Sequence, residues 1–290
     1  MDAGILTLTL NPCLDKTLWR ETWDGPVVRT QTQSGGKGLN VARVLSALGE
    51  DCLAVTALGG DAGRECADLA RKEGIRLMTV DSGEETRVIV TEALVDTYEQ
   101  RQHYVSGRPL PGEVLSALEK ETVEAMEGRR IFCLCGTAPD EKSAALGAAL
   151  LCEAKRRGLM TVLDSRGEAL RLGMEAAPDI IKPNEVEFDQ LMGRHVEPDE
   201  TFSAAEELAG RGLVVLLTLG DRGAVCAADG NLYCAPAEKG KAVNPVGCGD
   251  TFLAAWLHAR IQGRDQMDSL RFACHTAARS ASVWQAAFLP

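Results

Sequence analysis

Residues 130–164 read RIFCLCGTAPDEKSAALGAALLCEAKRRGLMTVLD, and this stretch indicates the fold. Two short apolar runs, 130–135 and 160–164, have the length of buried strands, and the segment between them, 141–157, has apolar residues at helical spacing. Two strands joined by such a helix run parallel, because a tight hairpin can only join antiparallel strands. The stretch therefore predicts a parallel sheet covered by helices.

The same alternation of strands and helices extends from this stretch toward both ends of the chain. Expected strands cover residues 5–10, 53–58, 179–181, 213–219, 224–227 and 231–235. Expected helices cover residues 38–48, 62–73, 113–127, 185–192, 202–211, 249–263 and 267–285. This alternation is typical of an α/β protein in which helices cover both faces of a mostly parallel central sheet.

Two β-rich segments interrupt this alternation, near residues 15–33 and 86–105. Within the second segment, 86–95 and 98–105 alternate in polarity, as strands with one face toward solvent do. Neither segment fits the strand and helix repeat, so we expect them to form a small lid sheet. No linker rich in serine or proline divides the chain, and the sequence predicts a single domain over residues 1–290.

The 290 residues carry a net charge of −11, which disfavours a nucleic-acid partner, because proteins that bind nucleic acids usually present basic surfaces. The N-terminal residues lack the basic region of a signal peptide. No window approaches the roughly 18 apolar residues of a membrane span. We therefore expect a cytoplasmic protein that has no membrane partner.

Ten cysteines raise the question of disulfides or a zinc site. None of them forms a CxxC pair, and the four histidines do not cluster near them. Most lie in apolar stretches, such as Cys133 and Cys135, so we expect buried free thiols in a reducing compartment.

The strongest functional motif is NPVGCGDT at residues 244–251, followed by an apolar helix. The glycines permit close approach of a ligand at the helix N-terminus, where exposed amide groups and the helix dipole favour a phosphate. Asp250 at this position can accept a proton from a substrate hydroxyl. Taken alone, the motif is also compatible with a plain turn followed by a capping residue.

A second glycine-rich motif, GGKGLNVAR at residues 35–43, again precedes a helix. Its spacing differs from that of the Walker A loop and from that of the dinucleotide-binding GxGxxG. A Rossmann dehydrogenase would also need GxGxxG after the first strand, where Asn11-Pro12-Cys13 stands instead. The motif predicts a polar site for a polyol or a phosphate, although a turn and cap would give the same pattern.

Five motifs occur in the order seen in ribokinase-like (PfkB) sugar kinases, and the chain resembles that family over nearly its whole length. They are Asn11-Pro-Cys-Leu-Asp15, the loop at 35–42, KPNEVE at 182–187, TLGDRGA at 218–224 and GCGD at 247–250. Within the family, the opening motif and the glycine loop are most similar to the 1-phosphofructokinase and tagatose-6-phosphate kinase branch. The resemblance implies a three-layer α/β sandwich with a β-sheet lid.

The resemblance also implies roles for the matched residues. Asp250 corresponds to the catalytic base, and the anion hole corresponds to Gly247, Cys248 and Gly249. Contacts to the sugar or its phosphate are implied for Asp15, Gly36, Lys37, Asn40, Arg87 and Thr137. ATP contacts are implied for Lys182, Asn184, Thr218, Gly220 and Gly223, and Glu187 is expected to hold Mg²⁺ through water.

The sequence departs from the family pattern at several positions. Cys248 replaces the usual alanine, and the usual GSLP becomes Gly136-Thr-Ala-Pro139. The usual DTSG becomes Asp164-Ser-Arg-Gly167, and the customary NExG of the lid becomes Val105-Ser-Gly-Arg108. These departures leave the identity of the sugar open.

The sequence thus predicts an ATP- and Mg²⁺-dependent kinase that converts fructose 1-phosphate to fructose 1,6-bisphosphate. Tagatose 6-phosphate, fructose 6-phosphate or an unphosphorylated sugar are alternative acceptors, and a non-catalytic sugar-phosphate sensor is a more remote alternative. Because the chain is strongly acidic, a phosphorylated acceptor requires local cations, for which we expect Lys37 and Arg87. The exposed edges of a small lid sheet further predict a homodimer joined through the lid.

Overall fold

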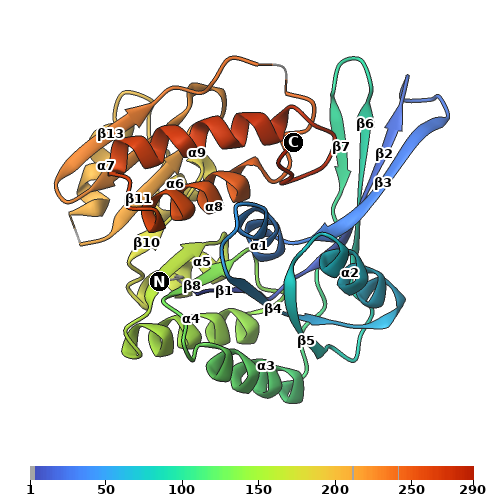
Figure 1. Ribbon diagram of the computed structural model, residues 1–290, viewed down its shortest axis with the longest axis horizontal. Helices are drawn as coiled ribbons and strands as arrows, with labels where there is room; N and C mark the ends of the chain where they lie inside the picture. Colours follow the sequence, from blue (N-terminus) through green and yellow to red (C-terminus); the bar gives the residue numbers. More distant parts are fainter. Residues whose placement is uncertain (1–3, 211, 241) are drawn as a thin grey trace.

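The computed structural model describes residues 4–210, 212–240 and 242–290, and their strands form two separate sheets (Figure 1). The larger sheet has nine described strands in the order β13-β12-β11-β10-β9-β8-β1-β4-β5. Their bounds are β1 Ile5–Thr9, β4 Cys52–Leu58, β5 Arg76–Asp81, β8 Ile131–Cys135, β9 Met160–Asp164, β10 Ile180–Ile181, β11 Val214–Thr218, β12 Ala224–Ala228 and β13 Asn231–Ala235. The pairings from β5 through β11 are parallel, and β12 and β13 add antiparallel pairings at one edge.

Helices cover both faces of the larger sheet, so the main body has three layers. Their bounds are α1 Lys37–Ala47, α2 Gly60–Lys72, α3 Gly112–Ala125, α4 Glu141–Arg156, α5 Glu168–Glu175, α6 Glu185–Met192, α7 Thr201–Ala209, α8 Cys248–Ile261 and α9 Gln266–Ala281. Along β1, Ile5 packs in the apolar cluster with α1 and α8, whereas Leu6 and Leu8 pack in the cluster with α3 and α4. The strand is buried on both faces, as expected for the centre of a parallel sheet.

The smaller sheet has the order β3-β2-β6-β7 and extends to one side of the main body (Figure 1). Its strands are β2 Cys13–Arg20, β3 Val27–Gly35, β6 Val88–Leu94 and β7 Gln100–His103. β2 pairs antiparallel with β3 and parallel with β6. Because β3 leads directly into α1, this lid sheet is joined to the glycine loop at residues 35–38.

The α/β fold class, the mostly parallel sheet and the separate lid sheet confirm the predictions from the sequence. The first lid segment is longer than predicted, since β2 begins at Cys13 and β3 ends at Gly35, whereas β6 and β7 are shorter than the predicted strands 86–95 and 98–105. The edge strand β5 and the helix α5 were not predicted from the sequence. No residue of β5 is buried, so this strand gives little apolar alternation.

Two helices end earlier than predicted. The last helix was predicted to reach residue 285 but ends at Ala281, and the chain then turns so that Trp284 contacts Trp19 of the lid, with ring centroids 4.0 Å apart. The predicted helix 202–211 ends at Ala209 in the structure, and residue 211 lies outside the described residues.

All ten cysteines are free, and seven of them are buried; Cys152 and Cys234 are exposed and Cys248 is partly exposed. Among the described residues, no helix has both the length and the apolar character that a membrane crossing requires.

Candidate active site

The N-terminus of α8 forms a glycine turn around Gly247. This glycine is the N-cap residue and has φ of 78°, a left-handed conformation that glycine adopts without strain. A Cβ atom there would lie 2.9 Å from Ala287, so only glycine fits against the C-terminal segment. No side chain caps the first turn of α8, which leaves this helix end available to a ligand.

Lys182 lies beside the same turn. A Cβ atom built on Gly249 would be 3.3 Å from the Lys182 Nζ atom, so the ammonium group approaches the backbone of the turn closely. The side chain is only 3% exposed and follows β10 at the carboxyl end of the sheet. The helix N-terminus and the buried cation together favour a phosphate group at this position.

Asp250 occupies the first turn of α8 and is buried. Its Oδ2 atom accepts a 2.7 Å hydrogen bond from the Asn40 amide. Burial and the nearby Asp164 carboxylate raise the pKa of Asp250 to about 6, against the opposing effects of Lys37, Asn40 and Lys182. A carboxylate with this pKa is a stronger base than an ordinary aspartate and still ionises near neutral pH.

A charged cluster links the glycine loop to the other strand ends. The Lys37 Nζ atom lies 2.7 Å from Asp164 Oδ1 and 3.0 Å from Glu187 Oε1. The Lys182 Nζ atom lies 3.4 Å from the same Asp164 oxygen. Burial opposes the charge of Lys37, but the two carboxylates outweigh it, and the pKa of Lys37 is raised.

Lys37 was expected to contact the sugar and its phosphate. In the structure its ammonium group contacts two carboxylates, and its contact with a substrate stays a prediction. The carboxylate of Asp164, which was not predicted as a site residue, is fully buried, and its Oδ2 atom has no hydrogen-bond partner among the described residues.

The residues expected to bind ATP lie together at the carboxyl ends of β10 and β11. Asn184 caps α6 by accepting a hydrogen bond from the Glu187 amide, and the Glu187 carboxylate accepts one from the Asn184 amide. Thr218 pairs with Asn184 across the two strand ends. Gly220 and Gly223 flank a single 3₁₀ turn, and both have positive φ. Polar backbone and side-chain groups of two neighbouring loops therefore converge here.

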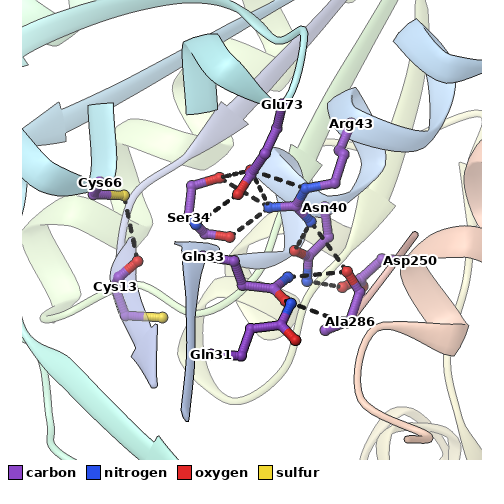
Figure 2. A network of polar contacts seen from close by, with 10 residues as sticks. All are labelled: Cys13, Gln31, Gln33, Ser34, Asn40, Arg43, Cys66, Glu73, Asp250 and Ala286. Atoms are coloured by element: carbon purple, nitrogen blue, oxygen red, sulfur yellow. Dashed lines mark hydrogen bonds and ion pairs between the residues drawn. The ribbon is translucent and has the colours of Figure 1, made fainter. Parts of the chain in front are cut away.

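A polar network behind Asn40 fixes its orientation (Figure 2). The Arg43 guanidinium donates to the Asn40 carbonyl oxygen at 2.7 Å and to the Glu73 carboxylate at 2.9 Å. The Asn40 amide group is thereby left to donate to Asp250. Arg43 belongs to the GGKGLNVAR motif, but nothing in the motif indicates that it acts through Asn40 rather than on a ligand.

Asp15 lies on β2, where the lid meets the glycine loop. Burial raises its pKa to about 6, although Arg43 and Arg87 lower it. A Cβ atom at Gly35 would lie 2.6 Å from Asp15 Oδ2, so the carboxylate packs directly on the glycine backbone. At Gly36, φ of 121° further requires glycine before α1 begins.

Arg87 holds the start of the lid strand β6 against the loop after β1. Its guanidinium donates to the carbonyl oxygens of Asn11 at 2.8 Å, Pro12 at 3.1 Å and Val105 at 2.9 Å. The Asn11 amide donates to the Thr137 hydroxyl at 2.9 Å. Both expected phosphate contacts, Arg87 and Thr137, thus lie next to Asn11.

A cavity of about 520 Å³ opens beside these residues and extends to the first turn of α6. Its polar lining includes Asn11, Tyr104, Thr137, Arg166, Asn184 and Glu187. Tyr104 and Arg166 were not predicted as site residues. The altered lid and DTSG motifs were the only sequence features that pointed to them.

The pfkB family carbohydrate kinase model matches residues 5–288. The chain is 33% identical to 1-phosphofructokinase of Haloferax volcanii, covering 96% of this chain and 91% of that protein. It is 29% identical to tagatose-6-phosphate kinase of Staphylococcus epidermidis, covering 86% of this chain and 83% of that protein. The crystal structure of phosphofructokinase-2 from Escherichia coli in complex with substrates and products matches with a TM-score of 0.87 and 26% identity, covering 96% and 93% of the two chains.

Proposed function

The chain belongs to the pfkB family of carbohydrate kinases and is an ATP-dependent sugar kinase, and from this premise we propose that its acceptor is a ketose phosphate. The favoured reaction converts fructose 1-phosphate and ATP to fructose 1,6-bisphosphate and ADP. The 33% identity to a 1-phosphofructokinase supports this choice. Tagatose 6-phosphate is the second candidate, because a relative named for that activity has 29% identity.

The observation that carries the proposal is the buried Asp250 at the uncapped N-terminus of α8, with Lys182 beside it. Asp250 accepts the proton of the attacking hydroxyl, and Asn40 holds its carboxylate in place. The amide groups of residues 247–250 and the Lys182 ammonium group stabilise charge on the phosphoryl group in transfer. A non-catalytic sensor has no use for a base at this position.

The charged cluster fits a magnesium ion that binds together with ATP. Among the described residues no group of three His, Cys, Asp or Glu side chains converges on one point, but Asp164 Oδ2 has no partner and Glu187 faces the cavity. Mg²⁺ typically takes one or two carboxylates and completes its shell with water and phosphate oxygens. Asp164 and Glu187 would hold the ion, which would neutralise charge on the ATP phosphates.

Recognition of the acceptor phosphate rests on Arg87. Its guanidinium donates to three backbone carbonyl oxygens, contacts the Tyr104 side chain and forms no ion pair among the described residues. A planar guanidinium of this kind suits a phosphate group. We do not assign this role to Lys37, because its ammonium group contacts Asp164 and Glu187.

A coupled assay of ATP consumption over a panel of acceptors tests the proposal. The panel contains fructose 1-phosphate, tagatose 6-phosphate, fructose 6-phosphate and free fructose, each with MgATP. We expect the highest kcat/KM with fructose 1-phosphate. A higher kcat/KM with tagatose 6-phosphate would make that sugar the acceptor and leave the mechanism unchanged. Binding of a sugar phosphate without turnover would indicate a sensor.

We further propose that two copies of the chain pair through the lid sheet. Val27 and Val28 of its edge strand β3 are 39% and 48% exposed, and an edge strand also presents unpaired backbone groups. Pairing of two lid sheets would cover the two valine side chains and the unpaired backbone groups.

A further inference from the structure

We propose that Arg166 and Tyr104 extend the phosphate-binding site of Arg87, so that the acceptor phosphate is bound between two guanidinium groups that face one tyrosine ring. This inference rests on the proposed function and adds two residues to it. It also gives a physical role to Arg166, which stands where the family pattern has serine.

The geometry brings three segments of the chain together at one aromatic ring. The Arg87 guanidinium lies 5.1 Å from the centre of the Tyr104 ring, and the Arg166 guanidinium lies 5.5 Å from it. Both distances are in the range of a cation–π contact. Tyr104 directly follows the lid strand β7, Arg87 precedes β6, and Arg166 follows β9 of the main sheet. The lid and the main body therefore share this contact.

The charge balance at the cavity leaves both arginines without a counter-ion. Two carboxylates line the cavity, but Arg171 binds that of Glu168, and Lys37 binds that of Glu187. Among the residues that the structure describes, neither Arg87 nor Arg166 forms an ion pair. Two guanidinium groups without an ion pair at one tyrosine ring, in a chain with a net charge of −11, favour an anionic ligand.

The hydroxyl groups nearby add hydrogen-bonding capacity to this positive site. Burial would raise the pKa of Tyr104, but the Arg87, Thr137 and Arg166 side chains at its hydroxyl lower it. The Thr137 hydroxyl also accepts from the Asn11 amide, so Tyr104, Thr137 and Asn11 form one polar group beside the two guanidinium groups. A phosphate group can thus receive hydrogen bonds from guanidinium and hydroxyl groups at once.

The position within the cavity favours the acceptor phosphate over the phosphates of ATP. Tyr104 lines the cavity together with Asn11 and Thr137, and Arg87 contacts the Tyr104 ring. Of the residues expected to bind ATP, Asn184 lines the cavity at the start of α6, whereas Thr218, Gly220 and Gly223 lie at the η1 turn, Gly220–Arg222. Binding at Tyr104 would also hold the lid against the main body while the sugar is present, which excludes water.

The test uses Arg166→Ala and Arg166→Ser, with Arg156→Ala as a control that removes an equally charged, exposed arginine of α4. We expect each Arg166 variant to raise KM for fructose 1-phosphate about tenfold or more, with kcat reduced less and KM for ATP unchanged. Tyr104→Ala should raise the same KM, and Arg156→Ala should leave it unaltered. Arg166→Lys should recover only part of the loss, since lysine lacks the planar fork.

A binding measurement separates this inference from the proposed function. Calorimetric titration of the wild type with fructose 1-phosphate in the absence of ATP should give a dissociation constant that rises about tenfold in Arg166→Ala. An unchanged constant and KM would overturn the inference while leaving the kinase assignment intact. A rise in KM for ATP alone would also overturn it, because Arg166 would then serve the nucleotide. A wild type that phosphorylates only free sugars would refute the proposed acceptor instead.

Discussion

Asp250 is buried and Asp15 is partly buried, and desolvation raises the pKa of each carboxyl group to about 6. Their surroundings differ in a way that assigns different roles. Asp250 stands in the first turn of α8 beside the Lys182 ammonium group, whereas Asp15 lies on the lid strand β2. Only Asp250 is placed to accept a proton next to the transferred phosphoryl group.

The role of Asp250 predicts a large loss of turnover in Asp250→Asn. We expect kcat to fall at least about 100-fold, the lower range for positioned acid–base catalysis. Asparagine can still accept the hydrogen bond from Asn40 and removes a charge whose burial costs free energy, so the melting temperature should not fall. Steady-state kinetics and thermal unfolding measure the two effects, and near-normal turnover would remove Asp250 from the role of base.

The raised pKa of Asp250 also predicts the pH dependence. A base must be unprotonated, so kcat/KM should fall as the pH drops through about 6, where the Asp250 carboxylate gains a proton. Asp15→Asn distinguishes the two carboxyl groups, because the acidic limb should persist in this variant even if KM rises. Loss of the acidic limb in Asp15→Asn would show instead that Asp15 is the group whose protonation lowers kcat/KM.

At the scale of single elements, the start of α8 shows how the backbone makes the site. Gly247 has positive φ and is packed on Ala287, while Gly263 just beyond the other end of α8 has φ of 80° and open space around it. Both glycines thus have a backbone conformation that would be strained in any other residue, but only Gly247 is tightly packed. Alanine variants at the two positions therefore separate the effect of backbone strain from the function of the turn.

Gly247→Ala and Gly263→Ala are therefore matched variants. Each should lose about 1–2 kcal/mol of stability, because alanine is strained at positive φ. Gly247→Ala should lose more, since its Cβ atom would be only 2.9 Å from Ala287, and it alone should lower kcat by displacing the amide groups of the turn. Chemical denaturation and kinetics measure both. Equal kcat values for the two variants would contradict an anion-binding role.

Elements that carry a strong period or a glycine motif were predictable from the sequence, and weaker ones were not. The glycine loop before α1 and the turn before α8 were predicted because their glycines occupy positions that other residues cannot. β5 was missed because none of its residues is buried, and α5 was missed although α6, which has the same length, was predicted. The pairing of Lys37 with Asp164 joins positions 127 residues apart, and no local pattern reveals it.

For the whole molecule, the lid sheet determines the expected assembly. Val28 on the edge strand β3 is 48% exposed, and a charge placed there should disrupt pairing of two lids. We expect a dimer of the wild type at micromolar concentration and a shift toward monomer in Val28→Glu. Phe202→Glu is the control, because Phe202 is similarly exposed but lies on α7. Light scattering measures the mass, and a monomeric wild type would contradict the prediction.

The central claim is that this sugar kinase acts on an acceptor that already carries a phosphate. The most direct test is the ratio of kcat/KM for fructose 1-phosphate to that for free fructose, measured with the wild type under one set of conditions. Charged hydrogen bonds to the phosphate are worth about 1.5–3 kcal/mol each, so Arg87 alone predicts a ratio of at least about ten. A ratio of one or less would contradict the account, because the cations at the cavity would then have no phosphate to bind.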